Sequence, residues 1–265
     1  MPLPEVVKGK SVKPRRVLLY GTHGIGKSTW AAGSPTPLVL ATEDGLDDIG
    51  VDRSPLLRST HDLARWLIEL GGEEDHGYKT VVIDTLDWTE QLIQKATCEE
   101  HNKKSIEEFG FGKGYALCIP RWRQLLLWLD CCRLKGMNVI LLAHARVERF
   151  TPPDGDAYDR WVPDLHKTVS PLLQEWADEI FFATYKVNTI TSDEGFGKQR
   201  SRAIGDGERV VYTCELPTHA AKRRIDLPNE LPLAWAEYQT HWPTNGNIKN
   251  VVVNGSSKKK EKVNG

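Results

Sequence analysis

One short segment constrains the fold of this chain more than any other. Residues 21–28 read Gly-Thr-His-Gly-Ile-Gly-Lys-Ser, a complete G-x-x-x-x-G-K-[ST] phosphate-binding loop between an apolar run and a helix-compatible stretch. Backbone N–H groups of such a turn wrap a polyphosphate when side chains stay clear and a helix N-terminus faces the anion. Lys27 then reaches the β- and γ-phosphates, and the Ser28 hydroxyl ligates Mg²⁺. The alternative is a glycine-rich turn with an incidental lysine. We expect ATP and Mg²⁺ as cofactors, with the nucleotide held by Gly21, Thr22, His23, Gly24, Ile25, Gly26, Lys27, Ser28 and Thr29.

Length and composition place the chain among ordinary globular proteins. Its 265 residues are enough for one medium domain with extensions, and the formal net charge is −1. Nucleic-acid binding would therefore need a local basic patch. The five cysteines are scattered and form no C-x-x-C pair, which favours reduced thiols in a cytoplasmic protein. No segment resembles a signal peptide or a membrane span, so we expect no membrane partner.

Strands alternate with helices along most of the chain. Nearly continuous apolar strands of this kind favour a parallel sheet covered on both faces, so the predicted class is α/β with a mainly parallel sheet and a C-terminal β-hairpin extension. We expect an N-terminal arm over 1–14, one domain over 15–243 and a disordered Lys-rich tail over 244–265. The expected strands are 16–20, 38–41, 80–84, 138–143 and 178–185. The expected helices are 27–32, 61–70, 86–100, a segment from 122 to near 136, 168–177 and one around Trp235. The hairpin is expected within 195–211.

Polar side chains follow three of these strands. Asp84 ends the β-branched run 80–83 and is the candidate Mg²⁺ ligand beside Ser28. Glu43 directly follows the strand 38–41 and is the candidate that activates the attacking water, with Asp44 as its competitor. Both acids could instead be turn residues before Gly45. His144 follows the strand 138–143 and either contacts the γ-phosphate or is a structural histidine.

These residues together resemble the RecA-like P-loop ATPase family, in particular its phage-encoded nucleotide-binding and single-strand annealing proteins. The resemblance spans about residues 15–240 and implies a RecA-like P-loop NTPase core. It implies that Glu43 activates water and that His144 couples nucleotide to DNA. The motifs that carry it are the phosphate loop, Ala-Thr-Glu-Asp-Gly at 41–45, Val-Val-Ile-Asp-Thr at 81–85, Phe-Gly-Lys-Gly-Tyr at 111–115, Leu-Leu-Ala-His at 141–144, and Ala-Lys-Arg-Arg with the later Leu-Pro at 221–228.

The resemblance also places single-stranded DNA on two segments, about 102–116 and 145–167. Both carry aromatic and basic residues, as single-strand binding requires, and we expect the second to be a long polar loop. A substrate lid or plain surface loop is the alternative, because 145–167 holds more acids than bases. The family also completes its sites with basic residues from a neighbouring subunit, which implies a homo-oligomeric ring or filament. Candidates for that role are Lys198, Arg200, Arg202, Lys222, Arg223 and Arg224.

The leading functional hypothesis is an ATP- and Mg²⁺-dependent, DNA-coupled ATPase that promotes annealing or recombination, in the host cytoplasm if the chain is phage-encoded. The extra terminal modules of filament-forming members are not recognisable, so annealing is expected rather than strand exchange. A single-strand DNA-binding protein is a further candidate partner. One alternative is a nucleotide-gated mediator with little turnover, and another is a P-loop phosphotransferase.

Overall fold

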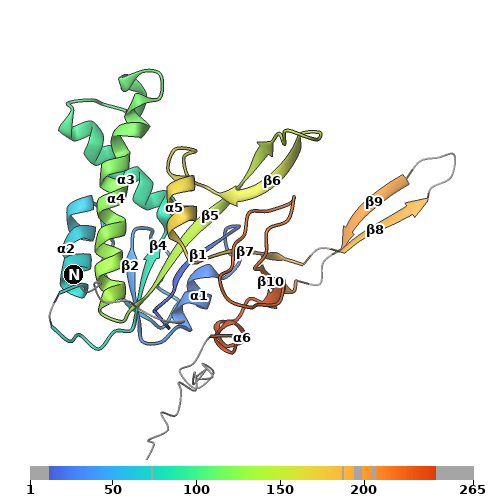
Figure 1. The fold of residues 1–265 in the computed structure, drawn as a ribbon, viewed down its shortest axis with the longest axis horizontal. Coiled ribbons are helices and arrows are strands. Elements are labelled where there is room, and N and C mark those ends of the chain that lie inside the picture. Colours follow the sequence, from blue (N-terminus) through green and yellow to red (C-terminus); the bar gives the residue numbers. More distant parts are fainter. Residues whose placement is uncertain (1–11, 73, 187, 194–198, 205–206, 243–265) are drawn as a thin grey trace, which may run out of the picture.

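A computed structural model describes residues 12–72, 74–186, 188–193, 199–204 and 207–242 (Figure 1), with side chains left undescribed over 187–206. Most of the expected N-terminal arm and the whole of the expected Lys-rich tail lie outside these residues. The described residues contain no helix that is both long and apolar enough to cross a membrane. Their five cysteines are all unpaired.

One large sheet organises the described part of the chain. The strand order is β11-β10-β7-β1-β5-β4-β2-β3, so the strand that precedes the phosphate loop lies near the middle. The parallel strands are β1 (Arg16–Gly21), β2 (Pro37–Ala41), β3 (Asp52–Arg53), β4 (Thr80–Asp84), β5 (Asn138–Phe150) and β7 (Glu179–Tyr185), and the antiparallel edge consists of β10 (Arg209–Tyr212) and β11 (Glu230–Pro232).

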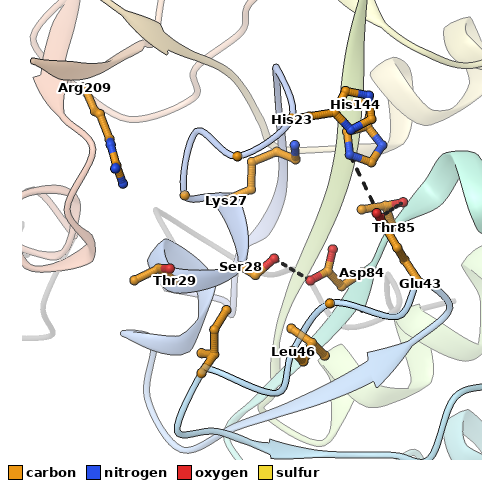
Figure 2. Close-up of a pocket in the computed structure, with 14 residues that line it drawn as sticks. His23, Lys27, Ser28, Thr29, Glu43, Leu46, Asp84, Thr85, His144 and Arg209 are labelled. Atoms are coloured by element: carbon orange, nitrogen blue, oxygen red, sulfur yellow. Dashed lines mark hydrogen bonds and ion pairs between the residues drawn. The ribbon is translucent and has the colours of Figure 1, made fainter. Parts of the chain in front are cut away.

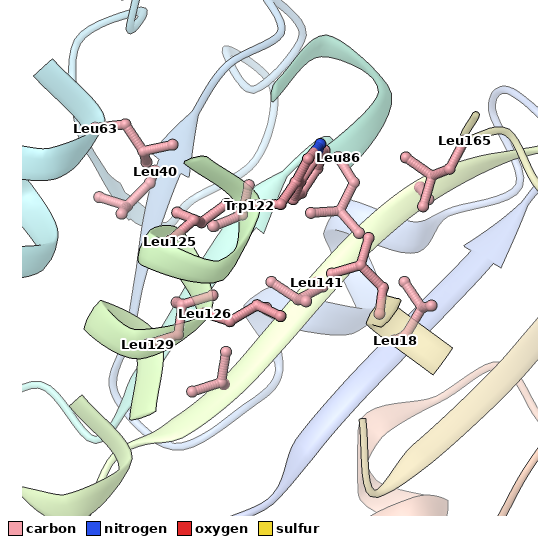
Figure 3. Close-up of a cluster of buried hydrophobic side chains, with 14 of the residues drawn as sticks. Leu18, Leu40, Leu63, Leu86, Trp122, Leu125, Leu126, Leu129, Leu141 and Leu165 are labelled. Carbon is pink, nitrogen blue, oxygen red and sulfur yellow. The ribbon is translucent and has the colours of Figure 1, made fainter. Parts of the chain in front are cut away.

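Helices cover both faces of this sheet, because alternate residues of each strand point to opposite sides. Leu18 and Tyr20 of β1 belong to one buried cluster, whereas Val17 and Leu19 belong to the other. Figure 3 shows Trp122, Leu125, Leu126 and Leu129 of the helix 113–134 in the first cluster, with Leu141 of the sheet next to Leu126. The first face carries α2 (Thr60–Leu70), α3 (Leu86–Glu100), α4 (Lys113–Leu134) and α5 (Ser170–Trp176), and the second carries α1 (Lys27–Ala32) and α6 (Trp235–Gln239).

The predicted fold class, an α/β fold with a mainly parallel sheet and helices on both faces, is confirmed. The helices 27–32 and 86–100 and the strand 80–84 have their predicted bounds. The expected C-terminal hairpin is also present, as the antiparallel pair β8 (Asn188–Asp193) and β9 (Gln199–Ile204). It begins earlier than expected, and the residues assigned to its end form β10, which joins the main sheet instead.

The segment 145–167 is not the long loop expected from its polarity. β5 continues past His144 to Phe150 and pairs antiparallel with β6 (Tyr158–Pro163), from Ala145 opposite Pro163 to Phe150 opposite Tyr158. The prediction was wrong because much of this ribbon is solvated and its burial is concentrated near the base, at residues such as Val162 and Pro163, so its strands show no long apolar run. In Figure 1 this β5–β6 hairpin projects from the sheet beside α5.

The segment 102–116 is also more regular than expected. It contains the short 3₁₀ helix η1 (Ile106–Phe109), and α4 begins already at Lys113. Ile106 is buried and Phe109 packs against the first core cluster. This segment is therefore attached to the helical layer rather than being a free loop.

Candidate functional site

The phosphate loop links the end of β1 to the start of α1 at the edge where the parallel strands end. Gly21 fits only as glycine, because a Cβ there would lie 2.4 Å from the carbonyl oxygen of Ala183 on β7. Gly26 has φ +106, a left-handed conformation that L side chains rarely adopt. Two glycines of the motif are therefore required by the backbone, and they aim the first turn of α1 into the site.

Lys27 is held inside the loop before any anion binds. Lys27 is only 6% exposed, and its Nζ donates hydrogen bonds of 3.1 Å to the carbonyl oxygens of Gly21 and Thr22. Burial lowers the pKa of Lys27, and the carboxylates of Asp84, Asp87 and Glu43 offset part of that shift. A desolvated ammonium group of this kind gains strongly from a polyphosphate.

The structure brings together Ser28 and Asp84, the two residues predicted to hold Mg²⁺. The Ser28 hydroxyl donates a 2.6 Å hydrogen bond to Oδ2 of Asp84 across the start of α1 and the end of β4. Burial raises the pKa of Asp84, against the hydrogen bond from Ser28 that lowers it. A hydroxyl and one buried carboxylate suit Mg²⁺, which takes few protein ligands and fills its shell with phosphate oxygens and waters. The described residues contain no cluster of three or more potential His, Cys, Asp or Glu ligands.

Glu43 and His144 lie close together, on the side of Lys27 that faces away from β10 (Figure 2). The backbone N–H of Glu43 donates to the carbonyl oxygen of Asp84, which ties the ends of β2 and β4 together. Oε2 of Glu43 accepts a 3.3 Å hydrogen bond from the Thr85 hydroxyl and lies 3.9 Å from Nε2 of His144. Asp44 is exposed and does not line the cavity, whereas Glu43 does. The roles of Glu43 and His144 remain predictions.

His144 is fixed by Asp87, which the sequence did not identify as a site residue, and by His23 of the phosphate loop. Asp87 accepts hydrogen bonds from the backbone N–H of His144 at 3.1 Å and pairs with its Nδ1 at 2.8 Å. Burial disfavours ionisation of Asp87, but the hydrogen bonds from His144 outweigh it and lower the pKa of Asp87. The ring of His23 stacks on that of His144 with centroids 3.8 Å apart. With Nδ1 engaged by Asp87, Nε2 faces Glu43 and the cavity.

These side chains line one cavity of ≈ 390 Å³ (Figure 2). It opens between the phosphate loop, the turn after β2 and the ends of β4 and β5. Arg209 of β10 lies across the loop from His144 and was not anticipated, because nothing in the sequence near it signals a site. The lining residues are His23, Gly24, Gly26, Lys27, Ser28, Thr29, Glu43, Gly45, Leu46, Ile49, Asp84, Thr85, His144 and Arg209.

Three of the six basic residues considered for a neighbouring subunit's site already have partners within the chain. Lys222 donates to carbonyl oxygens at the end of α5, including Ala177 at 2.7 Å. Arg223 donates to Asn229 at 3.0 Å, and Arg224 pairs with Asp178 at 3.1 Å. Lys198 lies outside the described residues, and the side chains of Arg200 and Arg202 are likewise not described.

The two segments expected to bind DNA present their aromatic rings differently. In 102–116 only Phe111 is fully exposed, whereas Tyr115 stacks on His166 with centroids 3.6 Å apart. On the β5–β6 hairpin, the ring of Phe150 lies 5.4 Å from that of Tyr158 and 5.2 Å from the guanidinium of Arg160. The three share one face of the ribbon, because cross-strand partners and alternate residues point the same way.

α3 contacts both ends of the β5–β6 hairpin. Asp87 in its first turn binds His144, where the hairpin leaves the sheet, and Glu90 one turn later accepts the backbone N–H of His166 at 3.1 Å. Burial raises the pKa of Glu90 to about 7, against the hydrogen bond from His166 that lowers it. One helix therefore connects the cavity to the base of an exposed ribbon.

Comparisons with known proteins agree with this architecture. Residues 13–225 match the family model described as an AAA domain. The SPbeta prophage-derived uncharacterized protein YorG of Bacillus subtilis (strain 168) is 26% identical over 157 residues, which cover 55% of this chain and 46% of that protein. The chain thus spans about half the length of this curated relative.

Two solved structures are distant likenesses. The RadB recombinase is 13% identical with a TM-score of 0.42, over 76% of this chain and 81% of that one. The flagellar accessory protein FlaH from Methanocaldococcus jannaschii is 12% identical with a TM-score of 0.35, over 83% of this chain and 92% of that one.

Proposed function

The chain belongs to the AAA domain family, and on that premise we propose that it is an ATP- and Mg²⁺-dependent ATPase that binds single-stranded DNA and promotes annealing or homologous recombination. A phage origin is supported by the prophage-derived relative. We further propose that it acts in the host cytoplasm as a homo-oligomer, with a single-strand DNA-binding protein as a candidate partner.

The observation that carries the ATPase proposal is the convergence of four groups on one cavity. A buried lysine, a hydroxyl–carboxylate pair and a second carboxylate meet there, contributed by Lys27, Ser28 with Asp84, and Glu43. Each serves a different part of triphosphate hydrolysis. Lys27 balances the negative charge of the phosphates, Ser28 and Asp84 hold the metal, and Glu43 orients a water and accepts its proton. Bound Mg²⁺ neutralises charge on the phosphate oxygens.

His144 links this chemistry to the proposed DNA site. Its Nε2 faces the cavity beside Glu43, and the strand that carries it continues directly to Phe150 on the β5–β6 hairpin. Aromatic rings stack on unpaired bases, and arginine attracts the phosphate backbone. The Arg160 side chain is 11% exposed and pairs with Glu215 at 2.9 Å, so it holds the cluster in place. The rings of Phe150 and Tyr158 therefore support single-strand binding on this face of the hairpin.

The test is the rate of ATP hydrolysis with and without single-stranded DNA, in the wild type and in Glu43→Gln. We expect DNA to raise the wild-type rate. We expect the variant to lose about 100-fold or more in rate while still binding ATP, because the amide cannot accept the proton. A rate indifferent to DNA would contradict the DNA half of the proposal. Negligible wild-type turnover with retained ATP affinity would favour the nucleotide-gated mediator.

A further inference from the structure

Arg209 reaches the nucleotide cavity from a strand that the phosphate-loop motif does not include. β10 runs antiparallel to β7, so its first residue lies at the same edge as the last residues of the parallel strands. The carbonyl oxygen of Arg209 accepts a 3.0 Å hydrogen bond from Leu233, and Arg209 pairs in register with Tyr185. The backbone that carries the guanidinium is therefore fixed on both sides.

The guanidinium lies over the last glycine of the phosphate loop. Its Nη1 is 3.1 Å from the position that a Cβ on Gly26 would occupy, with a methyl group of Leu233 3.7 Å from the same point. Figure 2 shows Arg209 on the side of the loop away from His144 and Glu43, with Thr29 beneath it. Two cations therefore line the cavity at the loop: Lys27 lies within the loop, and Arg209 lies outside it.

Arg209 differs from the other cations in this part of the molecule because no described residue makes a hydrogen bond or ion pair with its guanidinium. Lys186, on the neighbouring strand end, pairs with Glu230 at 2.6 Å. Arg224 pairs with Asp178, and Lys222 caps α5. An arginine that is exposed, lines a polar cavity and lacks an acidic partner is free to bind an anion.

We propose that Arg209 binds phosphate oxygens of the nucleotide from outside the loop, at the end of the cavity remote from Glu43 and His144. This inference rests on the proposed ATPase function and names a contact that the motif does not contain. A guanidinium presents paired N–H donors that match phosphate oxygens, and charge-assisted hydrogen bonds of this kind are among the strongest in proteins.

The position of Arg209 also predicts which kinetic constant it controls. A contact remote from the attacking water acts on bound substrate and transition state alike, so its loss raises KM and leaves kcat nearly unchanged. A cation that acted on the departing phosphate would instead lower kcat. The two roles are therefore separable by steady-state kinetics.

The experiment measures the affinities of Mg-ATP and of inorganic tripolyphosphate for wild type, Arg209→Ala and Arg209→Lys, with Arg123→Ala as a matched control. Arg123 is an exposed arginine on α4, on the far face of the sheet. We expect Arg209→Ala to raise the Kd of both ligands about tenfold, Arg209→Lys to raise it less, and Arg123→Ala to change neither. The KM for ATP should rise in parallel while kcat stays within about twofold.

Unchanged affinities in Arg209→Ala would overturn the inference. A loss for ATP without a loss for tripolyphosphate would also overturn it, by placing the guanidinium on the base or ribose. Failure of the wild type to bind Mg-ATP would instead refute the proposed ATPase function on which the inference rests. Thermal unfolding of each variant without ligand distinguishes a lost contact from a lost fold, and partial rescue by Arg209→Lys does so independently.

Discussion

The nucleotide cavity and the β5–β6 hairpin share one strand but are built in opposite ways. In the cavity, His144 is 6% exposed, and its ring is held by Asp87 and by the stacked ring of His23. Further along β5, Val147 is 51% and Phe150 36% exposed, and the charged pairs around them face solvent. Buried polar groups must be matched to partners, so the cavity is preorganised. Exposed rings and weak surface pairs leave the hairpin available to a partner.

The difference matters because one helix contacts both regions. Asp87 of α3 binds His144, and Glu90 of the same helix accepts a hydrogen bond from His166, just after the hairpin returns to its base. A chain of hydrogen-bonded groups of this kind is a candidate route for coupling between the two sites. The predictions below separate the cavity from the hairpin and then test the helix that joins them.

The largest expected effect is at the buried cation of the cavity. In Lys27→Ala we expect the Kd for Mg-ATP to rise about 100-fold and hydrolysis to fall to background, because charge-assisted hydrogen bonds to the phosphates are lost. Isothermal titration and a phosphate-release assay measure the two quantities. Lys135→Ala removes an exposed lysine after α4 and should change neither. Retention of wild-type turnover by Lys27→Ala would show that the cavity is not the hydrolytic site.

An intermediate effect is expected on the hairpin. Phe150→Ala combined with Tyr158→Ala should weaken binding of single-stranded DNA about 30-fold or more, since each base stacked on an aromatic ring contributes about 1–3 kcal/mol. Fluorescence anisotropy with a labelled oligonucleotide measures the affinity. Val147→Thr is the matched control, because it changes an exposed residue on the opposite face of the same ribbon. Equal losses in control and test variants would point to a general defect of the hairpin rather than to stacking.

The smallest effect is expected at Glu90, and it appears as a pH dependence of stability. Burial raises the pKa of Glu90 from 4.5 to about 7, so the folded state keeps a proton that the unfolded state has released between these values. The stability contributed by the neutral acid is present below pH 4.5 and is lost as the pH rises through about 7. Glu90→Gln should remove this loss and stabilise the protein at pH 8 by about 2 kcal/mol.

Thermal unfolding of Glu90→Gln and wild type between pH 5 and 8 measures the difference as a function of pH. Glu99→Gln, an exposed residue later on the same helix, is the control and should follow the wild type. If Glu90→Gln and wild type lose stability in parallel across this range, the buried acid is not the titrating group.

Much of the nucleotide site could be predicted because its signals are local in the sequence. The phosphate loop is contiguous, and Glu43 and Asp84 each directly follow an apolar strand. Parallel strands end at one edge of the sheet, so residues that follow different strands must meet. The match to the AAA domain family and the position of the loop strand within the sheet agree with the P-loop fold that these signals predict.

What the sequence missed depends on contacts between distant segments. Asp87 was correctly placed in the first turn of a helix, but only the packing of α3 beside β5 brings it to His144. Arg209 enters the cavity through the register of β10 against β7, which no local pattern encodes. The β5–β6 hairpin was missed for a different reason, since burial is concentrated near its base, at residues such as Val162 and Pro163, and no long apolar run marks its strands.

The central claim is that the cavity and the hairpin are coupled, and the most direct measurement is the affinity for single-stranded DNA in different nucleotide states. We expect Glu43→Gln to hold ATP without turnover, so its Kd for a labelled oligonucleotide can be compared with Mg-ATP, with Mg-ADP and without nucleotide. Coupling between sites is typically 5- to 150-fold, and we predict tighter binding by at least about fivefold with Mg-ATP than without nucleotide. The same Kd in all three states, with ATP demonstrably bound, would contradict the account.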